Sequence, residues 1–431
     1  MRDGGRLAAA VEVLTDIETR RQPVQEALKD WGKSHRFAGS GDRVAIGNLV
    51  FDALRHKLSY GHVMGEGSPR ALVLATYCFG WGHSVSVLKK VLAEDPHAPA
   101  QLSDEEEEAL SKGTSSLETA ESHIQADVPL WLWHYFSKAF GDEAVGVGQS
   151  LSKRAPIDMR ANLIKSSAQK VVKRLSHLGA KESGLSSVGV RLEPVSGAKK
   201  SPHVQAEEGF RKGWFELQDE ASQIAAILSG AQPGEQVLDM CAGGGGKSLA
   251  LAGQMGNRGQ IYAYDSNKLR LAPLYERMAR AGVRNIQVID PQLGDLTDLK
   301  GRMDRVMVDA PCTGTGVWRR RPDTKWRVGE TALEGRLSEQ AQVLENAADY
   351  VSSGGKLIYA TCSLLSAEND DQVAAFLAKR PDFKLVNLEG TWQDTFSDET
   401  RRPVFGEGGT VTLTPYHCDT DGFFIAMMER G

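Results

Sequence analysis

From residue 215 onward, the chain alternates short apolar runs of strand length with longer helical patterns. Five strands are expected, over residues 236–240, 260–265, 285–290, 305–309 and 356–361. Helices are expected between most of them, over residues 249–255, 268–281 and 333–351. This alternation predicts an α/β fold with a doubly wound, mainly parallel sheet. Ligands of such a sheet bind outside the carboxyl ends of its strands, so the residues that follow each strand are the first candidates for chemistry.

The first 214 residues divide into two further parts. Residues 1–145 carry apolar side chains at helical spacing, as at Leu7, Val11 and Leu14, and predict an all-helical domain. Residues 155–214 have short apolar runs separated by Gly, Ser and Lys, and predict a small α/β module. A chain of 431 residues is too long for one ordinary core. We therefore expect three domains, over residues 1–145, 155–214 and 215–431.

Composition is that of a soluble globular protein, with 41% hydrophobic and 25% charged residues. No apolar run approaches the length of a membrane span, and acidic residues near the N-terminus argue against a secretory signal. Five cysteines without CxxC or zinc-type spacing predict free thiols in a reducing cytoplasm, with no metal site. The net charge of −5 includes an acidic cluster at 104–108, so only local basic clusters can indicate nucleic-acid binding.

A glycine-rich turn follows the first expected strand, which Asp239 closes. The run Gly243 to Gly246 lets the backbone approach a ligand closely, because no Cβ intervenes. Asp265 ends the second strand 19 residues beyond Gly246, at a distance suited to a ribose hydroxyl. Asp290 ends the third strand and could accept from an adenine amino group. The pattern predicts an adenosine-containing cofactor, NAD or S-adenosylmethionine, and lacks the spacing of a P-loop.

Two cysteines follow the fourth and fifth strands, Cys312 in Asp309-Ala-Pro-Cys and Cys362 in Ala-Thr-Cys-Ser. A thiolate that adds to C6 of cytosine turns C5 into a nucleophile, which can attack a sulfonium methyl group. A carboxyl group such as Asp309, if protonated, could donate to N3 and lower the barrier to addition. A single buried cysteine is usually only a small hydrophobe. Two at adjacent strand ends favour covalent chemistry.

A basic and aromatic segment follows Cys312. Its cations and indoles are Trp318, Arg319, Arg320, Arg321, Lys325, Trp326 and Arg327. Cations contact phosphates and indoles stack on bases, so the segment predicts contact with an RNA strand.

From about residue 155 to the C-terminus, the chain resembles the RNA cytosine-C5 methyltransferase family, whose bacterial members include the 16S ribosomal RNA enzymes of the Fmu or Sun type. The resemblance rests on the segments 213–222, 239–247, 309–316, 321–323, 359–363 and 421–424. Residues 42–58 resemble, over a shorter stretch, the NusB-like helical domain that precedes the catalytic part in some members. The resemblance implies a class I methyltransferase fold, Rossmann-like, with S-adenosyl-L-methionine as cofactor.

The resemblance also implies a role for each candidate residue. The cofactor contacts would be Cys241, Ala242, Gly243, Gly244, Gly245, Gly246, Lys247, Asp265, Asp290 and Asp309. Cys362 would be the nucleophile, and Cys312 would assist elimination and product release. The chain has Gly243-Gly244 where the family usually has Ala-Pro, which predicts a more flexible turn and a lower cofactor affinity. Asp295 is the alternative to Asp290 for the adenine contact.

The function implied is that of a cytoplasmic RNA methyltransferase that makes 5-methylcytosine, in 16S ribosomal RNA or, as the alternative, in tRNA. DNA cytosine-C5 enzymes use the cysteine of Pro-Cys, here Cys312, as nucleophile, but they lack a counterpart of the Thr-Cys-Ser strand end. Two further classes stay open, a nicotinamide-dependent oxidoreductase and a catalytically weak RNA-binding factor of ribosome assembly. We expect an RNA partner, no membrane association and no metal, and the sequence is compatible with a monomer.

Overall fold

The computed structural model describes residues 1–292 and 296–431, and it divides into two compact units. The first unit, called the helical unit, contains residues 1–154, 194–201 and 317–328. The second, called the catalytic unit, contains residues 155–193, 202–316 and 329–431. Two segments distant in the sequence, 194–201 and 317–328, thus belong to the helical unit.

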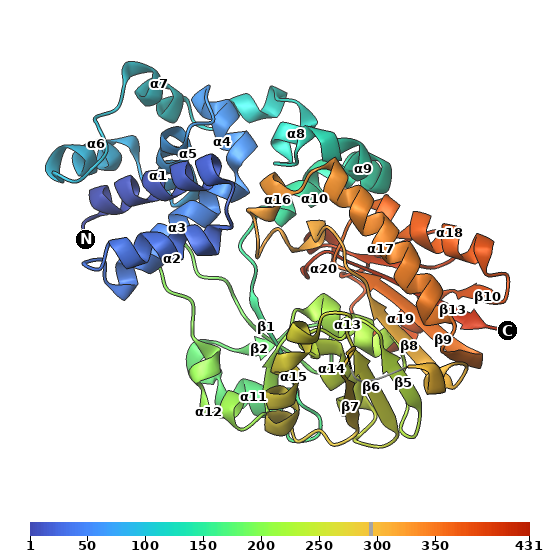
Figure 1. Cartoon of the computed structure of the whole chain (residues 1–431). Helices are drawn as coiled ribbons and strands as arrows, with labels where there is room; N and C mark the ends of the chain where they lie inside the picture. The colour runs from blue at the N-terminus through green and yellow to red at the C-terminus, as the bar shows by residue number, and fades with distance from the viewer. Residues whose placement is uncertain (293–295) are drawn as a thin grey trace. The chain divides into compact units, whose positions relative to one another are not determined.

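The helical unit is built from helices that surround an apolar core. They are α1 (Asp3–Arg20), α2 (Val24–Ser34), α3 (Ser40–Arg55), α4 (Lys57–Met64), α5 (Pro69–Ala75), α6 (Val85–Glu94), α7 (Asp104–Lys112), α8 (Ser122–Gln125), α9 (Leu130–Phe140), α10 (Ala144–Leu151) and α16 (Thr324–Arg327) (Figure 1). Leu7, Leu14 and Leu49 are buried in this core, as their helical spacing predicts. The acidic cluster forms the first turn of α7, where Ser103 and Glu106 make a capping box and negative charge stabilises the helix dipole.

The basic and aromatic segment 317–328 is largely buried in the helical unit. Trp318 is 1% exposed and stacks on Phe136, with ring centroids 5.6 Å apart. Lys325 is also 1% exposed, and its Nζ donates to the backbone oxygen of Arg55 at 3.3 Å. Burial lowers the pKa of this lysine to about 8.

The predicted RNA contact is therefore wrong for Trp318, Arg319 and Lys325, all of which are buried. The physical reason is that long amphipathic side chains can fill a core: the indole of Trp318 packs on Phe136, and a backbone oxygen accepts from the ammonium of Lys325. Trp326 follows the same rule, because its Nε1 donates to the oxygen of Leu54 at 2.8 Å. Arg321 and Arg327 are exposed.

The catalytic unit begins with the small α/β module, whose sheet is antiparallel throughout. The strand order is β2-β3-β1-β4, with bounds β1 (Ile157–Ala161), β2 (Lys181–Glu182), β3 (Gly189–Leu192) and β4 (Phe215–Leu217). Helices α11 (Ala168–Arg174) and α12 (Glu208–Arg211) complete the module. The buried Arg191 guanidinium joins it to the rest of the unit, since it pairs with Asp158, Glu220 and Asp419.

The large sheet has the order β11-β12-β13-β9-β8-β5-β6-β7, and β10 pairs with β13. Its strands are β5 (Gln236–Asp239), β6 (Gln260–Tyr264), β7 (Ile286–Ile289), β8 (Met303–Asp309), β9 (Val351–Thr361), β10 (Phe383–Val386), β11 (Val404–Phe405), β12 (Val411–Leu413) and β13 (Phe423–Arg430). The strands β5 to β9 are parallel, which confirms the doubly wound fold, and the edge from β10 to β13 is antiparallel.

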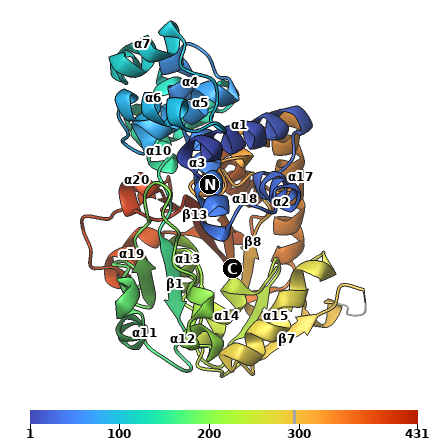
Figure 2. The same cartoon turned by 90° about the vertical axis from the view of Figure 1, so that its left-hand side faces the viewer.

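Helices cover both faces of this sheet. One face carries α13 (Glu220–Leu228), α14 (Gly246–Gln254), α15 (Lys268–Ala281) and α19 (Leu388–Thr395), and the other carries α17 (Glu330–Ala348) and α18 (Asp370–Lys379) (Figure 1 and Figure 2). Successive side chains of a strand point to opposite faces of the sheet. In β5, Val237 therefore packs with α14 and α15, while Leu238 packs with α17. A short helix, α20 (Pro415–Cys418), precedes β13.

Across the described ranges, no helix combines the length and hydropathy that crossing a membrane requires. Within the same residues, no group of three or more His, Cys, Asp or Glu side chains is arranged to hold a metal ion.

Candidate active site

The two cysteines lie side by side at the carboxyl edge of the large sheet. Strands β8 and β9 are parallel neighbours, and Asp309 pairs in register with Ala360, so the residues that follow them meet at one edge. The Sγ atoms of Cys312 and Cys362 are 3.3 Å apart, a hydrogen-bond distance for sulfur, and both thiols are free. The structure thus brings together the pair that the sequence singled out.

The environment of Cys312 keeps this thiol protonated. Its hydrogen bond with Cys362 raises the pKa of Cys312 well above the ordinary value, and burial and the negative charge of Glu368 act in the same direction. A thiol that keeps its proton can donate it to the neighbouring sulfur. The pair therefore contains one potential proton donor and one potential acceptor.

The buried carboxylate of Glu368 holds both cysteine loops. Its Oε1 accepts from the backbone N–H of Thr313 at 2.8 Å and from Nε2 of Gln340 at 3.0 Å. Its Oε2 accepts from the hydroxyls of Thr313 and Ser363, the residues that follow the two cysteines. Within the described residues no cation pairs with Glu368, so hydroxyl and amide donors alone stabilise its charge.

Sequence reasoning missed Glu368. The only signal was a carboxylate six residues after Cys362, in a polar stretch with no basic partner nearby. Its burial follows from the packing of α17 and the 366–368 turn, which the local sequence does not encode.

Two of the segments that carry the family resemblance touch through glycine. The N–H of Gly422 donates to the oxygen of Gly316 at 2.8 Å. A Cβ on Gly316 would lie 2.1 Å from the oxygen of Gly422, so this approach requires glycine. The contact places Phe423 beside the glycine-rich turn, where the Nζ of Lys247 lies 4.7 Å from its ring centroid.

A pocket of 230 Å³ opens over the glycine-rich turn. The predicted cofactor residues that line it are Cys241, Ala242, Gly243, Gly244, Gly246, Lys247 and Asp309. The other lining residues are Leu217, Gln218, Ser222, Asp239, Arg270 and Arg277. Lys247 and Asp309 form an ion pair in it, with Nζ 2.7 Å from Oδ2. Burial raises the pKa of the Cys241 thiol, so this third cysteine stays neutral beside the pocket.

Three predicted cofactor residues do not line this pocket. Gly245 has φ +78° and faces Leu274, where a Cβ would come within 2.1 Å of Cδ1. Asp265 is buried behind the turn, and its Oδ2 accepts from the N–H of Gly243 at 3.0 Å. Asp290 ends the β7 region and pairs with Lys268 at 2.5 Å, which lowers the pKa of its carboxyl. Asp295 lies outside the described residues.

Three arginines hold the glycine-rich turn, two by its backbone oxygens and one through Asp265. Arg270 pairs with Asp265, with Nη1 3.1 Å from Oδ2. Arg277 donates from Nη1 to the oxygen of Gly244 at 2.5 Å. Arg160 donates from Nη1 to the oxygen of Gly246 at 2.8 Å. None of these residues was predicted, because they come from α15 and from β1 of the small module.

Asp239 is a buried acid under the same pocket. Its Oδ2 accepts from the hydroxyl of Ser248 at 2.6 Å, while its Oδ1 has no partner among the described residues. Burial, and to a lesser degree the negative charge of Asp309, raises the pKa of Asp239 to about 6. Asp239 is fully buried, so its carboxyl supports the glycine-rich turn from below.

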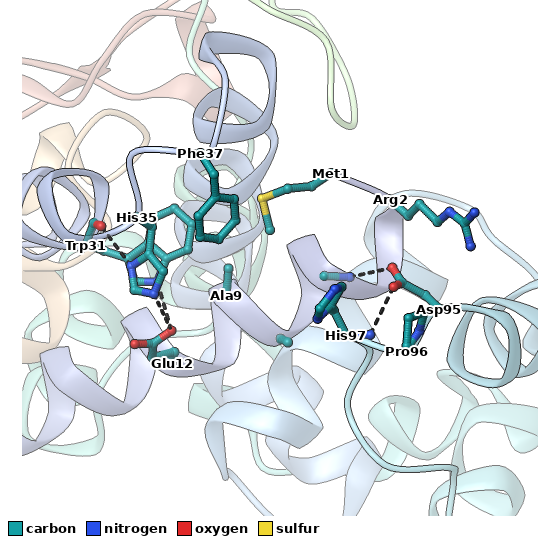
Figure 3. A pocket seen from close by; sticks show the side chains of 12 residues that line it. Met1, Arg2, Ala9, Glu12, Trp31, His35, Phe37, Asp95, Pro96 and His97 are labelled. Carbon is teal, nitrogen blue, oxygen red and sulfur yellow. Dashed lines mark hydrogen bonds and ion pairs between the residues drawn. The ribbon is translucent and has the colours of Figure 1, made fainter.

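The helical unit has a cavity of its own, of 490 Å³ (Figure 3). The rings of Trp31 and His35 are stacked there with centroids 4.3 Å apart, and Glu12 accepts from Nε1 of Trp31 at 2.9 Å. None of the predicted site residues lines this cavity.

The sheet order, the glycine-rich turn and the pocket at the carboxyl edge define a class I methyltransferase. Residues 226–429 match the family described as 16S rRNA methyltransferase RsmB/F. The "Probable ribosomal RNA small subunit methyltransferase B" of Synechocystis is 32% identical over 71% of this chain and 67% of its own length. The protein of the same name from Bacillus subtilis is 31% identical over 75% of this chain and 70% of its own length. The chain belongs to the RsmB/F family of methyltransferases.

Solved structures agree with this assignment. The crystal structure of PH0851 has a TM-score of 0.72 and 25% identity, and the match covers 99% of both chains. A methyltransferase homologue from Pyrococcus horikoshii has a TM-score of 0.58 and 26% identity, over 74% of this chain and 99% of its own. The NSun6 structure from the same organism, determined with SFG, has a TM-score of 0.59 at 22% identity, over 70% of this chain and 98% of its own, and shares the fold.

Proposed function

We propose that this protein methylates C5 of a cytosine in 16S ribosomal RNA through a covalent bond between Cys362 and C6 of the base. The observation that carries the proposal is the pair of sulfurs, 3.3 Å apart, at the same sheet edge as the glycine-rich turn. Family membership supports the reaction class. The names of the relatives support ribosomal RNA as the substrate, in the cytoplasm, and tRNA is the alternative.

The pocket residues fit S-adenosylmethionine as the methyl donor. Gly243 and Gly244 expose backbone where a side chain would crowd Arg270 and Arg277. Residues 241–247, Asp265, Asp290 and Asp309 would hold it. NSun6, which has the same fold, was determined with SFG, an analogue of this cofactor. When bound, S-adenosylmethionine supplies a methyl group that the activated ring takes at C5.

Asp309 and Lys247 would assist the addition step. The sulfur of Cys362 adds as a thiolate to C6. The carboxyl group of Asp309, which must first take up a proton because it is paired with Lys247, gives that proton to N3. The ammonium of Lys247, 2.7 Å from Asp309, stabilises the carboxylate that remains. Electron density then collects at C5, which becomes the nucleophile.

Cys312 would act in the elimination step. The proton on C5 must leave, the C5–C6 double bond must form again, and the bond between C6 and the sulfur of Cys362 must break. Cys312 gives its proton to the departing sulfur across the 3.3 Å contact, and the proton from C5 restores the Cys312 thiol. The proton on N3 returns to the Asp309 carboxylate as the ring becomes aromatic again. The raised pKa of Cys312 suits this role, because the group carries a proton at the start of the step.

The reciprocal assignment remains the alternative for the chemistry, with Cys312 as the nucleophile. The Thr-Cys-Ser strand end that carries the family resemblance favours Cys362, because the DNA enzymes that use the Pro-Cys cysteine lack it. The helical unit would serve as a NusB-like RNA-binding domain in either case.

The reaction is tested with deproteinised 16S ribosomal RNA and total tRNA from cells that lack the protein. After incubation with enzyme and S-adenosylmethionine, bisulfite sequencing should reveal one new 5-methylcytosine in the 16S RNA. A new 5-methylcytosine in tRNA alone would show that tRNA, and not 16S ribosomal RNA, is the substrate. No new 5-methylcytosine in either RNA would contradict the function.

The cofactor assignment has a separate test by calorimetry. Asp265→Ala should abolish binding of S-adenosylmethionine, because it removes both the carboxylate and the bond that fixes Gly243. Glu276→Ala, an exposed change on α15, is the matched control. Unchanged affinity in Asp265→Ala would remove this residue from the site.

A further inference from the structure

The small α/β module has a charge opposite to that of the chain. Residues 155–193 and 202–214 contain nine Lys or Arg and five Asp or Glu, whereas the whole chain has a net charge of −5. A local excess of positive charge in an acidic protein indicates a partner for that surface alone.

The positive charge gathers around α11 and α12. Six exposed cations form this group, called the α11–α12 surface: Lys165, Lys170, Lys173, Arg174, Arg211 and Lys212. Contacts between the two helices show that they are neighbours, since Arg174 and Lys212 both pair with Glu208. Glu207 and Glu208 neutralise part of the charge, and the remaining excess faces solvent.

An indole orients two of these lysines, and Lys170 has no carboxylate partner among the described ion pairs, whereas Lys212 also pairs with Glu208. The Nζ of Lys170 lies 4.2 Å from the ring centroid of Trp214, and the Nζ of Lys212 lies 5.6 Å from it. A cation–π contact restrains an ammonium group yet leaves its positive charge available to a second partner. This surface therefore differs from the segment 317–328, in which Arg319 and Lys325 are buried.

A chain of contacts through α15 links the α11–α12 surface to the cofactor pocket. The Nζ of Lys165 donates to the oxygen of Arg280 at 2.6 Å, which ties the surface to α15. Arg280 and Arg277 share the carboxylate of Glu216, at 2.7 and 3.1 Å, and Arg277 lines the pocket. One turn of α15 thus connects the lysines to the glycine-rich turn.

We propose that the α11–α12 surface binds the phosphate backbone of the substrate RNA and guides the strand toward the catalytic pocket. The inference rests on the proposed function for the identity of the polyanion. It adds the place of contact, which lies on the helices of the small module. Phosphates are the ligands that such a surface fits, because lysines at its rim contribute charge without a fixed donor geometry.

The test replaces three lysines and measures salt dependence. The variant Lys170→Gln, Lys173→Gln, Lys212→Gln is compared with a control that carries Lys300→Gln, Lys379→Gln and Lys384→Gln, three exposed lysines elsewhere in the catalytic unit. Binding of deproteinised 16S ribosomal RNA is measured between about 50 and 300 mM salt, because phosphate contacts weaken over roughly this range. Total tRNA is measured in parallel.

The slope of log K against log salt should fall by about two in the α11–α12 variant and should not change in the control. The KM for RNA should rise by about tenfold at low salt, with kcat at saturating RNA and the affinity for S-adenosylmethionine unchanged. Equal slopes for variant and control would overturn the proposal. This outcome is also the one expected if the surface binds an acidic protein and not RNA. An inactive wild-type enzyme would overturn the proposed function instead, so the two failures are distinguishable.

Discussion

The cysteine loops and the glycine-rich turn lie at one sheet edge but are held by opposite means. Hydroxyl and amide donors around the Glu368 carboxylate hold the cysteine loops, with no cation among the described contacts. Guanidinium groups of Arg160 and Arg277 hold the turn by its backbone oxygens. The hydrogen bond to Cys362, burial and the nearby Glu368 carboxylate raise the pKa of Cys312, whereas positive surroundings suit a pocket lined with carboxylates. The difference indicates that each side is arranged for the charge it must carry during the reaction.

The largest effect is expected at Glu368. Glu368→Leu leaves the N–H and the hydroxyl of Thr313 without their acceptor, and each buried group that loses its partner costs about 1–3 kcal/mol. The free energy of unfolding in urea should fall by about 3 kcal/mol or more, and turnover should be lost. Glu368→Gln keeps one acceptor oxygen and should recover part of the stability. Wild-type stability in the Leu variant would show that the carboxylate does not hold the loops.

The next effect concerns pH and Asp239. The pKa of its carboxyl is about 6 in the folded protein against an ordinary value of 3.8, so the folded state binds this proton more tightly. The stability that results is present below the unfolded value and is lost as pH rises through about 6. Asp239→Asn removes this loss, which amounts to about 2–3 kcal/mol. Urea unfolding of the free protein at acid and neutral pH measures it, and parallel pH profiles for both proteins would contradict the burial argument.

A smaller effect is expected at Arg277. Arg277→Ala removes a charge-assisted hydrogen bond to Gly244, which is worth about 1.5–3 kcal/mol. The Kd of S-adenosylmethionine should rise by about tenfold or more, because the turn loses its support. Calorimetry measures this, with the exposed Arg284→Ala as control. If both variants bind S-adenosylmethionine like the wild type, arginines do not hold the glycine-rich turn. The contrast between this turn and the cysteine loops would then be wrong.

The smallest effect is expected at Gly243, whose φ of +49° is unfavourable for any residue with a Cβ. Gly243→Ala should cost about 1–2 kcal/mol. In Gly244→Ala, where φ is not positive, the new Cβ would lie 3.3 Å from Nη1 of Arg277, and we expect a smaller cost. Thermal unfolding of the two variants compares them. A larger loss in Gly244→Ala would show that crowding, and not backbone strain, limits this turn.

Much of the fold could be predicted from the sequence, because strand and helix periods are local. The helix predicted over 268–281 has the bounds Lys268–Ala281, and the five predicted parallel strands all form. The two cysteines could be paired because consecutive strand ends in a doubly wound fold meet at one edge.

The rest depended on contacts between distant segments. The burial of Trp318 and Lys325 requires the helical unit to receive a segment from the middle of the catalytic sequence. The positions of Arg160, Arg277 and Glu368 follow from packing between elements, which no local pattern records.

The central claim is that Cys362 forms the bond to RNA and Cys312 breaks it. Cys312→Ala and Cys362→Ala are each incubated with 16S ribosomal RNA and S-adenosylmethionine, and the products are separated by denaturing electrophoresis. Cys312→Ala should accumulate a covalent protein–RNA adduct, and Cys362→Ala should form none. An adduct in Cys362→Ala, with none in Cys312→Ala, would contradict the account and exchange the roles of the two cysteines.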